Sequence, residues 1–217
     1  MKKLLIFDLD GTLADTINSI RHAVNLAMAH FGYPERSYEE VRLAIGDGAR
    51  VLIKRTLPVE ERENDETVDT VLAYYEKMYD ITHMEADRCY DKMAQTLAEL
   101  HKRGYKIAVL SNKQDVYVRS IVDKIVERGI VSLAMGQREG YPRKPDATVP
   151  LIITESLGFS PEDTVFIGDS EVDVLTAKNA GMMSIGCSWG YRGRAVLEEY
   201  GADFIVDTPP QLLDILG

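Results

Sequence analysis

Two aspartates at the end of a short apolar segment carry the clearest chemical signal in the chain. Asp8 and Asp10 follow Lys3–Phe7 and stand two residues apart, so an extended backbone would aim both carboxylates the same way. Like charges held together are costly unless a cation joins them. Gly11 lets the backbone approach a ligand closely, and Thr12 adds a hydroxyl and an amide. A divalent metal with a phosphate group would account for the cluster, and a polar turn is the simpler alternative.

Further polar side chains stand where later apolar strands are expected to end. They are Ser111 and Asn112 after residues 107–110, Asp169 and Asp173 after residues 164–167, and Lys144 at the entry of a helical segment. In open α/β sheets, ligands bind outside the carboxyl ends of the strands. The sequence therefore predicts one site at this edge of a sheet, which Asp8 and the later residues share.

Each of these later residues also has an ordinary structural explanation. Ser111 and Asn112 could simply cap the helix that follows them. Asp169 could be a turn residue, and Asp173 could be an acidic residue in the first turn of a helix. Lys144 could be a solvated loop lysine. Their coincidence at strand ends favours a shared site over a separate explanation for each residue.

The elements that must position these residues alternate between strand and helix from residue 91 onward. Such alternation predicts an α/β fold with a Rossmann-like parallel sheet and helices on both faces. After the first strand, helical periodicity covers residues 15–31, 38–45, 49–57 and 61–79 without a strand between them. We therefore expect a small all-helical cap domain over residues 15–84, inserted after the first strand. The catalytic core domain would comprise residues 1–14 and 85–217.

The order of these motifs resembles the haloacid dehalogenase-like hydrolase superfamily, in particular its phosphoglycolate phosphatase-like members. The matching segments are Asp8-Leu9-Asp10-Gly11-Thr12, Ser111-Asn112, Lys144-Pro145 and Gly168-Asp169-Ser170-Glu171-Val172-Asp173. They span nearly the whole chain in the expected order. Together they are far more specific than any one of them alone.

The resemblance implies a role for each residue. Asp8 would attack phosphorus and bind Mg²⁺, and Asp10 would act as acid and base while its main-chain carbonyl binds the metal. Asp169 would be a further metal ligand. Asp173 would not bind the metal directly but would hold metal-bound waters or Lys144 in position. The residues expected to bind the phosphorylated substrate are Thr12, Ser111, Asn112 and Lys144.

The expected cap contains a further candidate for substrate recognition. Gly46-Asp47-Gly48-Ala49-Arg50 resembles the cap loop that reaches the leaving group in related phosphatases. Arg50 would then meet an anionic part of the substrate, with a plain surface arginine as the alternative. Tyr191–Arg194, which follows a later strand, is a weaker candidate for the mouth of the site.

Charge and composition limit the partners. The 217-residue chain has a net charge of −10, which argues against nucleic acid and acidic membrane surfaces. Its apolar runs are too short to cross a bilayer, and we expect a cytoplasmic location. Two cysteines without CxxC spacing and four scattered histidines argue against a disulfide framework or a zinc site. The expected partner is a small phosphorylated metabolite, and the expected state is a monomer.

The leading hypothesis is a Mg²⁺-dependent phosphatase that hydrolyses a small phosphate monoester, such as 2-phosphoglycolate, through an aspartyl-phosphate. A β-phosphoglucomutase-like phosphoryl transferase is an alternative, and it would need a cap that excludes water. A haloacid dehalogenase is disfavoured, because dehalogenases of this resemblance lack the second aspartate found here at Asp10. A catalytically silent binding or regulatory protein on the same fold is disfavoured by the complete set of chemical residues.

Overall fold

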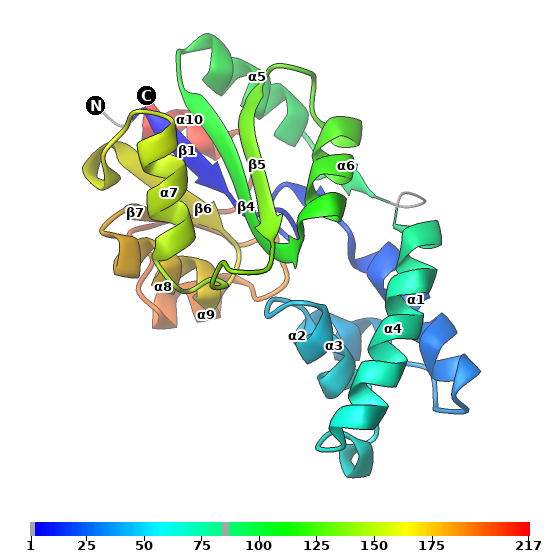
Figure 1. Ribbon diagram of the computed structural model, residues 1–217. Helices are drawn as coiled ribbons and strands as arrows, with labels where there is room; N and C mark the ends of the chain where they lie inside the picture. Colours follow the sequence, from blue (N-terminus) through cyan, green and yellow to red (C-terminus); the bar gives the residue numbers. More distant parts are fainter. Residues whose placement is uncertain (1–2, 84–86) are drawn as a thin grey trace. The chain divides into compact units, whose positions relative to one another are not determined.

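The computed structural model describes residues 3–83 and 87–217, which form two compact units (Figure 1). The sheet unit comprises the chain up to Asp15 and from Cys89 onward, and the helical unit runs from Thr16 to Arg88. The chain leaves the sheet unit after β2 (Ala14–Asp15) and returns to it at β3 (Arg88–Cys89). These two strands pair with each other in a two-stranded sheet. The domain boundary predicted at residues 84 and 85 lies outside the described residues.

The sheet unit is built on parallel strands in the order β5-β4-β1-β6-β7-β8 (Figure 1). Their bounds are β1 Leu4–Phe7, β4 Lys106–Gln114, β5 Val131–Gln137, β6 Thr164–Gly168, β7 Met183–Cys187 and β8 Phe204–Val206. The last residue of β1, Phe7, pairs with Val109 of β4 and Ile167 of β6. Residues that follow β1 and β6 therefore emerge side by side at the carboxyl edge of the sheet.

Helices cover both faces of this sheet. Their bounds are α5 Met93–Lys102, α6 Asp115–Ile125, α7 Thr148–Ser156, α8 Glu171–Ala180, α9 Arg194–Glu199 and α10 Gln211–Leu216. Figure 1 shows α7 and α8 on one side of the sheet and α5 and α6 on the other. Leu4 and Ile6 of β1 share a buried cluster with Ile153 of α7 and Ala177 of α8. A strand covered on both faces is apolar throughout, as β1 is.

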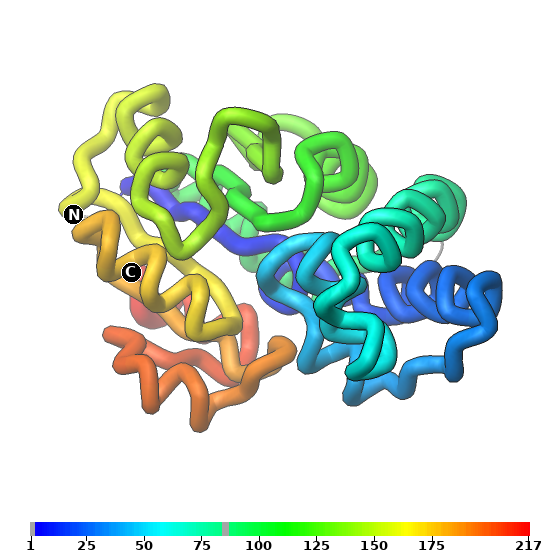
Figure 2. The backbone as a smooth tube through the Cα atoms, turned by 60° about the horizontal axis from the view of Figure 1, so that its bottom comes forward, coloured from blue at the N-terminus to red at the C-terminus, as the bar shows by residue number. Residues whose placement is uncertain are grey.

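The helical unit consists of α1 Ile17–His30, α2 Tyr38–Ala44, α3 Ala49–Thr56 and α4 Asp65–Thr82, with a 3₁₀ turn at Val59–Glu61. In both views α1 and α4 lie side by side (Figures 1 and 2), and this helix pair has extensive contacts. Val24 and Met28 of α1 and Val71 of α4 are buried, as expected for amphipathic helices that pack together. None of the described helices is long and apolar enough to cross a membrane.

The prediction of a parallel α/β fold with a helical insertion is confirmed, with one difference that affects the site. Instead of ending at Leu110, β4 continues to Gln114, with a shift in its register against β5 over this stretch. Ser111 and Asn112 therefore lie within the strand, and α6 begins only at Asp115. The alternative explanation, in which these two residues only cap the following helix, therefore does not apply. The end of this strand could not be recognised from an apolar pattern, because its side chains are polar and the hydrogen bonds between strands are formed by the main chain.

Candidate active site

Asp8 and Asp169 directly follow the neighbouring strands β1 and β6. The ladder continues for one residue, because the Asp8 N–H donates to the Ile167 carbonyl at 2.8 Å. Both carboxylates are buried, and Ser111, on the other neighbour of β1, is buried as well. The structure thus places the predicted strand-end residues at one edge of the sheet.

Lys144 is buried against two carboxylates. Its Nζ lies 2.8 Å from Asp8 Oδ1 and 2.7 Å from Asp173 Oδ1. Burial alone would lower the pKa of Lys144, but Asp173 and Asp8 raise it above its usual value, so the side chain stays charged. The Asn112 side-chain amide donates to the Lys144 carbonyl at 3.1 Å and accepts the Lys144 N–H at 2.9 Å. Asn112, which the sequence assigned to phosphate binding, thus positions Lys144.

Asp173 connects Lys144 to the main chain that carries Asp169. Its Oδ2 accepts the N–H groups of Asp169 and Ser170 at 3.1 Å each and the Ser170 hydroxyl at 2.7 Å. It lies in the first turn of α8, where the partial positive charge of the helix end favours a carboxylate. Gly168 makes room for it, because a Cβ there would lie 2.2 Å from Asp173 Cγ. These contacts fit the supporting role expected for Asp173.

A loop after β7 holds Asp169 in place. The Tyr191 N–H donates to Asp169 Oδ2 at 2.7 Å, and the Thr12 hydroxyl donates to Asp169 Oδ1 at 3.0 Å. The indole N–H of Trp189 donates to the Thr12 carbonyl at 3.1 Å. Thr12, which the sequence assigned to substrate binding, orients Asp169 here. The sequence made Tyr191 only a weaker candidate for the mouth of the site and did not predict that its N–H would hold Asp169.

Gly190 in this loop leaves no room for a side chain. A Cβ there would lie 2.2 Å from the Asp169 Cβ and 2.4 Å from the Gly11 carbonyl oxygen. We expect Gly190→Ala to displace Asp169 and lower kcat/KM at least about tenfold, or ~1.4 kcal/mol. Gly140→Ala is the control, because its Cβ would meet nothing within 4 Å, and its φ of +81° makes it the more demanding exchange for the backbone. Full activity of Gly190→Ala would show that the loop does not position Asp169.

The carboxylates of Asp8, Asp169 and Asp173 each offer an oxygen within 4.8 Å of the others. Burial raises the pKa of Asp8 to about 7, and Lys144 offsets only part of this effect. Burial, with the charges of Asp173 and Asp8, also raises the pKa of Asp169. Among the described residues, buried Asp8 Oδ1 has no donor in hydrogen-bond geometry, although the Lys144 ammonium is 2.8 Å away. A hard divalent cation fits these oxygen ligands and would compensate their charge.

Lys113 is a charged residue of the site that the sequence did not single out. Its Nζ lies 2.7 and 2.9 Å from the two carboxylate oxygens of Asp10. Both side chains are largely buried, with exposed fractions of 9% and 11%. Lys113 lies in the extension of β4, two residues after Ser111, whose hydroxyl accepts its N–H at 3.2 Å. The sequence feature that could have identified Lys113 as a site residue is its position directly after Ser111-Asn112.

Arg50, expected to meet the substrate, forms its ion pairs within the helical unit. Its guanidinium binds Asp65 at 2.6 Å and Asp69 at 3.0 Å, both on α4. Asp47 of the preceding loop pairs with Arg55 at 2.6 Å. These pairs hold α3 and its entry loop within their own unit. Substrate recognition by Arg50 stays a prediction.

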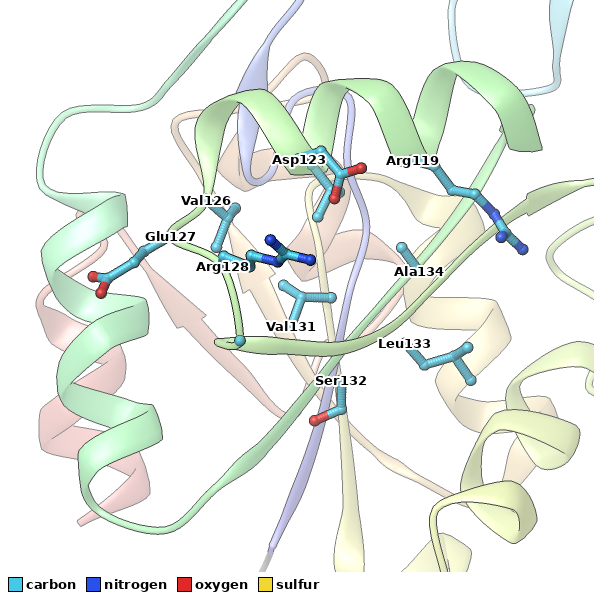
Figure 3. A pocket seen from close by; sticks show the side chains of 11 residues that line it. Arg119, Asp123, Val126, Glu127, Arg128, Val131, Ser132, Leu133 and Ala134 are labelled. Carbon is cyan, nitrogen blue, oxygen red and sulfur yellow. The ribbon is translucent and has the colours of Figure 1, made fainter.

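A separate pocket lies at the edge of the sheet, away from the strand ends (Figure 3). It encloses about 360 Å³ and is lined from Arg119 onward by the end of α6 and by residues 131–134 at the start of β5. The site residues follow the opposite, carboxyl ends of the strands. The pocket is therefore not part of the candidate active site.

Comparisons with known proteins agree with the motif order. A sequence model of haloacid dehalogenase-like hydrolases matches residues 5–187. Phosphoglycolate phosphatase 1 of Pseudomonas aeruginosa is 33% identical, with 98% of this chain and 79% of the relative covered. The phosphoglycolate phosphatase of Vibrio cholerae is 32% identical, with 99% and 96% covered.

A solved structure shares the fold of the whole chain. It is that of a candidate phosphoglycolate phosphatase from Lactobacillus delbrueckii subsp. bulgaricus, with a TM-score of 0.93 and 30% identity. The similarity covers 100% of this chain and 99% of that one. The resemblance inferred from the motifs is thus confirmed, and the chain belongs to the haloacid dehalogenase-like hydrolase family.

Proposed function

We propose that this protein is a Mg²⁺-dependent phosphatase that hydrolyses the phosphate monoester of a small metabolite. The observation that carries the proposal is the buried Lys144 ammonium, 2.8 Å from Asp8 and 2.7 Å from Asp173, together with the oxygen cluster that these two carboxylates form with Asp169. It combines a nucleophile, a fixed positive charge and oxygen ligands for a cation, which phosphoryl transfer requires. The names of the relatives make 2-phosphoglycolate the first candidate substrate.

In the first half of the reaction, an Asp8 oxygen attacks phosphorus. The new bond forms as the bond from phosphorus to the leaving oxygen breaks, and Asp10 gives that oxygen a proton. Lys144 and Ser111 would hold the phosphoryl oxygens and balance their charge. Asn112 contributes indirectly, because its side chain hydrogen-bonds to both the N–H and the carbonyl of Lys144 and so positions that residue.

In the second half, water attacks the phosphorus of the aspartyl-phosphate. Asp10 accepts a proton from this water, and the bond from phosphorus to the Asp8 oxygen breaks, which releases inorganic phosphate and restores Asp8. The same carboxyl group thus serves as acid and then as base. Asp173 keeps Lys144 in place throughout, because its own oxygens are bound to Lys144 and to the start of α8.

The proposed cofactor is Mg²⁺. The carboxylates of Asp8 and Asp169 would hold it, together with the main-chain carbonyl of Asp10. When bound, it neutralises negative charge on the phosphoryl group. The raised pKa of Asp8 supports this proposal, because the attacking carboxylate must be ionised and a cation favours the ionised form.

Release of inorganic phosphate from a panel of phosphorylated metabolites, including 2-phosphoglycolate, tests the function. We expect turnover with Mg²⁺, loss of turnover with EDTA, and poor support by the larger Ca²⁺ ion. Full turnover in metal-free buffer would exclude the cofactor. A Mg²⁺-loaded protein that releases phosphate from no monoester would exclude the function itself.

The raised pKa values of Asp8 and Asp169 predict how Mg²⁺ stabilises the protein at different pH. In the metal-free protein, carboxyls with raised pKa stabilise the fold at low pH, and this contribution is lost as pH rises toward 7, the value for Asp8. Mg²⁺ binds the ionised form, so its stabilising effect should grow with pH. We expect a larger Mg²⁺-induced rise in Tm at pH 8 than at pH 5.5.

Thermal unfolding with and without Mg²⁺ at the two pH values measures this effect. Asp169→Asn should remove most of the rise in Tm at pH 8, whereas Asp123→Asn, on the exposed face of α6, should leave it unchanged. An equal rise at both pH values would show that these carboxylates do not bind the ion.

A further inference from the structure

We propose that Lys113 recognises a second negative charge on the substrate, carried by the leaving group close to the ester oxygen. The substrates would then be phosphate monoesters of small hydroxy acids rather than of neutral alcohols. This inference rests on the phosphatase function proposed above. It assigns substrate recognition to a lysine of the sheet unit.

The first argument is the position of Lys113 beside Asp10. The Nζ contacts both Asp10 carboxylate oxygens, at 2.7 and 2.9 Å. In the proposed reaction Asp10 gives a proton to the leaving oxygen, so that oxygen must come within hydrogen-bond distance of the same carboxyl group. Whatever is bonded to the leaving oxygen therefore lies near Lys113.

The second argument is the reach of a short hydroxy acid. In a carboxymethyl phosphate, two covalent bonds separate the ester oxygen from the carboxylate carbon, which places the carboxylate oxygens within about 4 Å of the ester oxygen. A carboxylate at this distance can contact the Lys113 ammonium while Asp10 contacts the ester oxygen. A longer or uncharged substituent would not offer this pair of contacts.

The third argument is that such a substrate lets Lys113 exchange one carboxylate partner for another. A largely buried ammonium is stabilised by a carboxylate beside it, so a replacement anion would offset the loss of the Asp10 contact when Asp10 serves as the acid. A substrate carboxylate is that replacement, and a neutral leaving group is not. The ion pair seen here would thus make turnover depend on the charge of the leaving group.

The two cations predicted from the sequence to bind the substrate, Lys144 and Arg50, have other carboxylate partners. Lys144 lies between Asp8 and Asp173, where it serves the phosphoryl group that is transferred. Arg50 binds Asp65 and Asp69 within the helical unit. Of these three cations, Lys113 is the one that contacts Asp10, the carboxyl group proposed to act on the leaving oxygen.

The test compares 2-phosphoglycolate with its neutral amide, 2-phosphoglycolamide, in the Mg²⁺-loaded protein. The unmodified protein should prefer the charged ester, as measured by kcat/KM. Lys113→Met should lower this preference about 20-fold or more, the loss typical of a hydrogen bond to a charged group. Lys113→Arg keeps a charge and should keep part of the preference. Lys106→Met, at the opposite end of β4, should leave the preference unchanged.

Three results would overturn the inference. The first is equal hydrolysis of both esters by the unmodified protein. This result does not depend on whether any variant folds. The second is an equal loss on both esters in Lys113→Met, as expected if the lysine only orients Asp10. The third is a selective loss in Arg50→Ala with none in Lys113→Met. Absence of hydrolysis of any monoester by the unmodified protein would instead refute the proposed function.

Discussion

Asp8→Asn is expected to lower kcat at least a thousandfold, a rise of about 4 kcal/mol in the barrier. An amide is a poor nucleophile and a weaker, neutral metal ligand, so both proposed functions of Asp8 are lost together. The exchange is nearly isosteric, and Lys144 keeps its contact with Asp173 at 2.7 Å. The fold should therefore survive. Rapid-quench labelling with a phosphorylated substrate should show no phosphoenzyme.

The control for Asp8→Asn is Asp123→Asn, which removes an exposed carboxylate on α6 and should retain full activity. Circular dichroism and thermal unfolding would confirm that both variants are folded. A kcat above about a tenth of the unmodified value, a barrier change below ~1.4 kcal/mol, would refute the role of Asp8 as nucleophile.

The fold could be predicted from the sequence wherever burial produces an apolar pattern. The central strands β1 and β6 are buried at every position, so their apolar runs gave their positions directly. The end of β4 was missed, because Ser111–Gln114 continue the ladder with polar side chains. Apolarity reports which side chains are buried, whereas strand pairing depends on the main chain.

The candidate site could be predicted only in part. Residues that follow strands, such as Asp8 and Asp169, were predicted to lie together because parallel strands end at one edge. The contact of Lys113 with Asp10, and the lack of room for a side chain at Gly190 beside Asp169, could not be predicted. They depend on side-chain direction and on the path of a loop, which spacing along the chain does not determine. Arg50 was predicted to bind the substrate because its loop resembles a cap loop of related phosphatases. That resemblance carries no information about the ion pair between Arg50 and Asp65.

Lys144→Met is expected to damage both activity and stability. Activity should fall at least about a hundredfold, as when one preorganised charge is removed from beside a reacting group. Stability should fall by about 3–5 kcal/mol without metal, because the carboxylates of Asp8 and Asp173 lose the cation buried between them. For a chain of this length, each kcal/mol corresponds to about 2–4 °C in Tm. Steady-state kinetics and thermal unfolding measure the two effects.

The pH dependence separates charge compensation from simple loss of packing. Asp8 already has a raised pKa, and removing Lys144 raises it further, so at pH 5.5 the carboxyl takes up a proton and needs no cation. The loss of stability should therefore be larger at pH 8 than at pH 5.5. The double variant Lys144→Met/Asp173→Asn should regain part of the stability without regaining activity, because one buried charge is gone while the phosphoryl group still lacks its cation. An equal loss of stability at both pH values would mean that Lys144 acts through packing of its side chain.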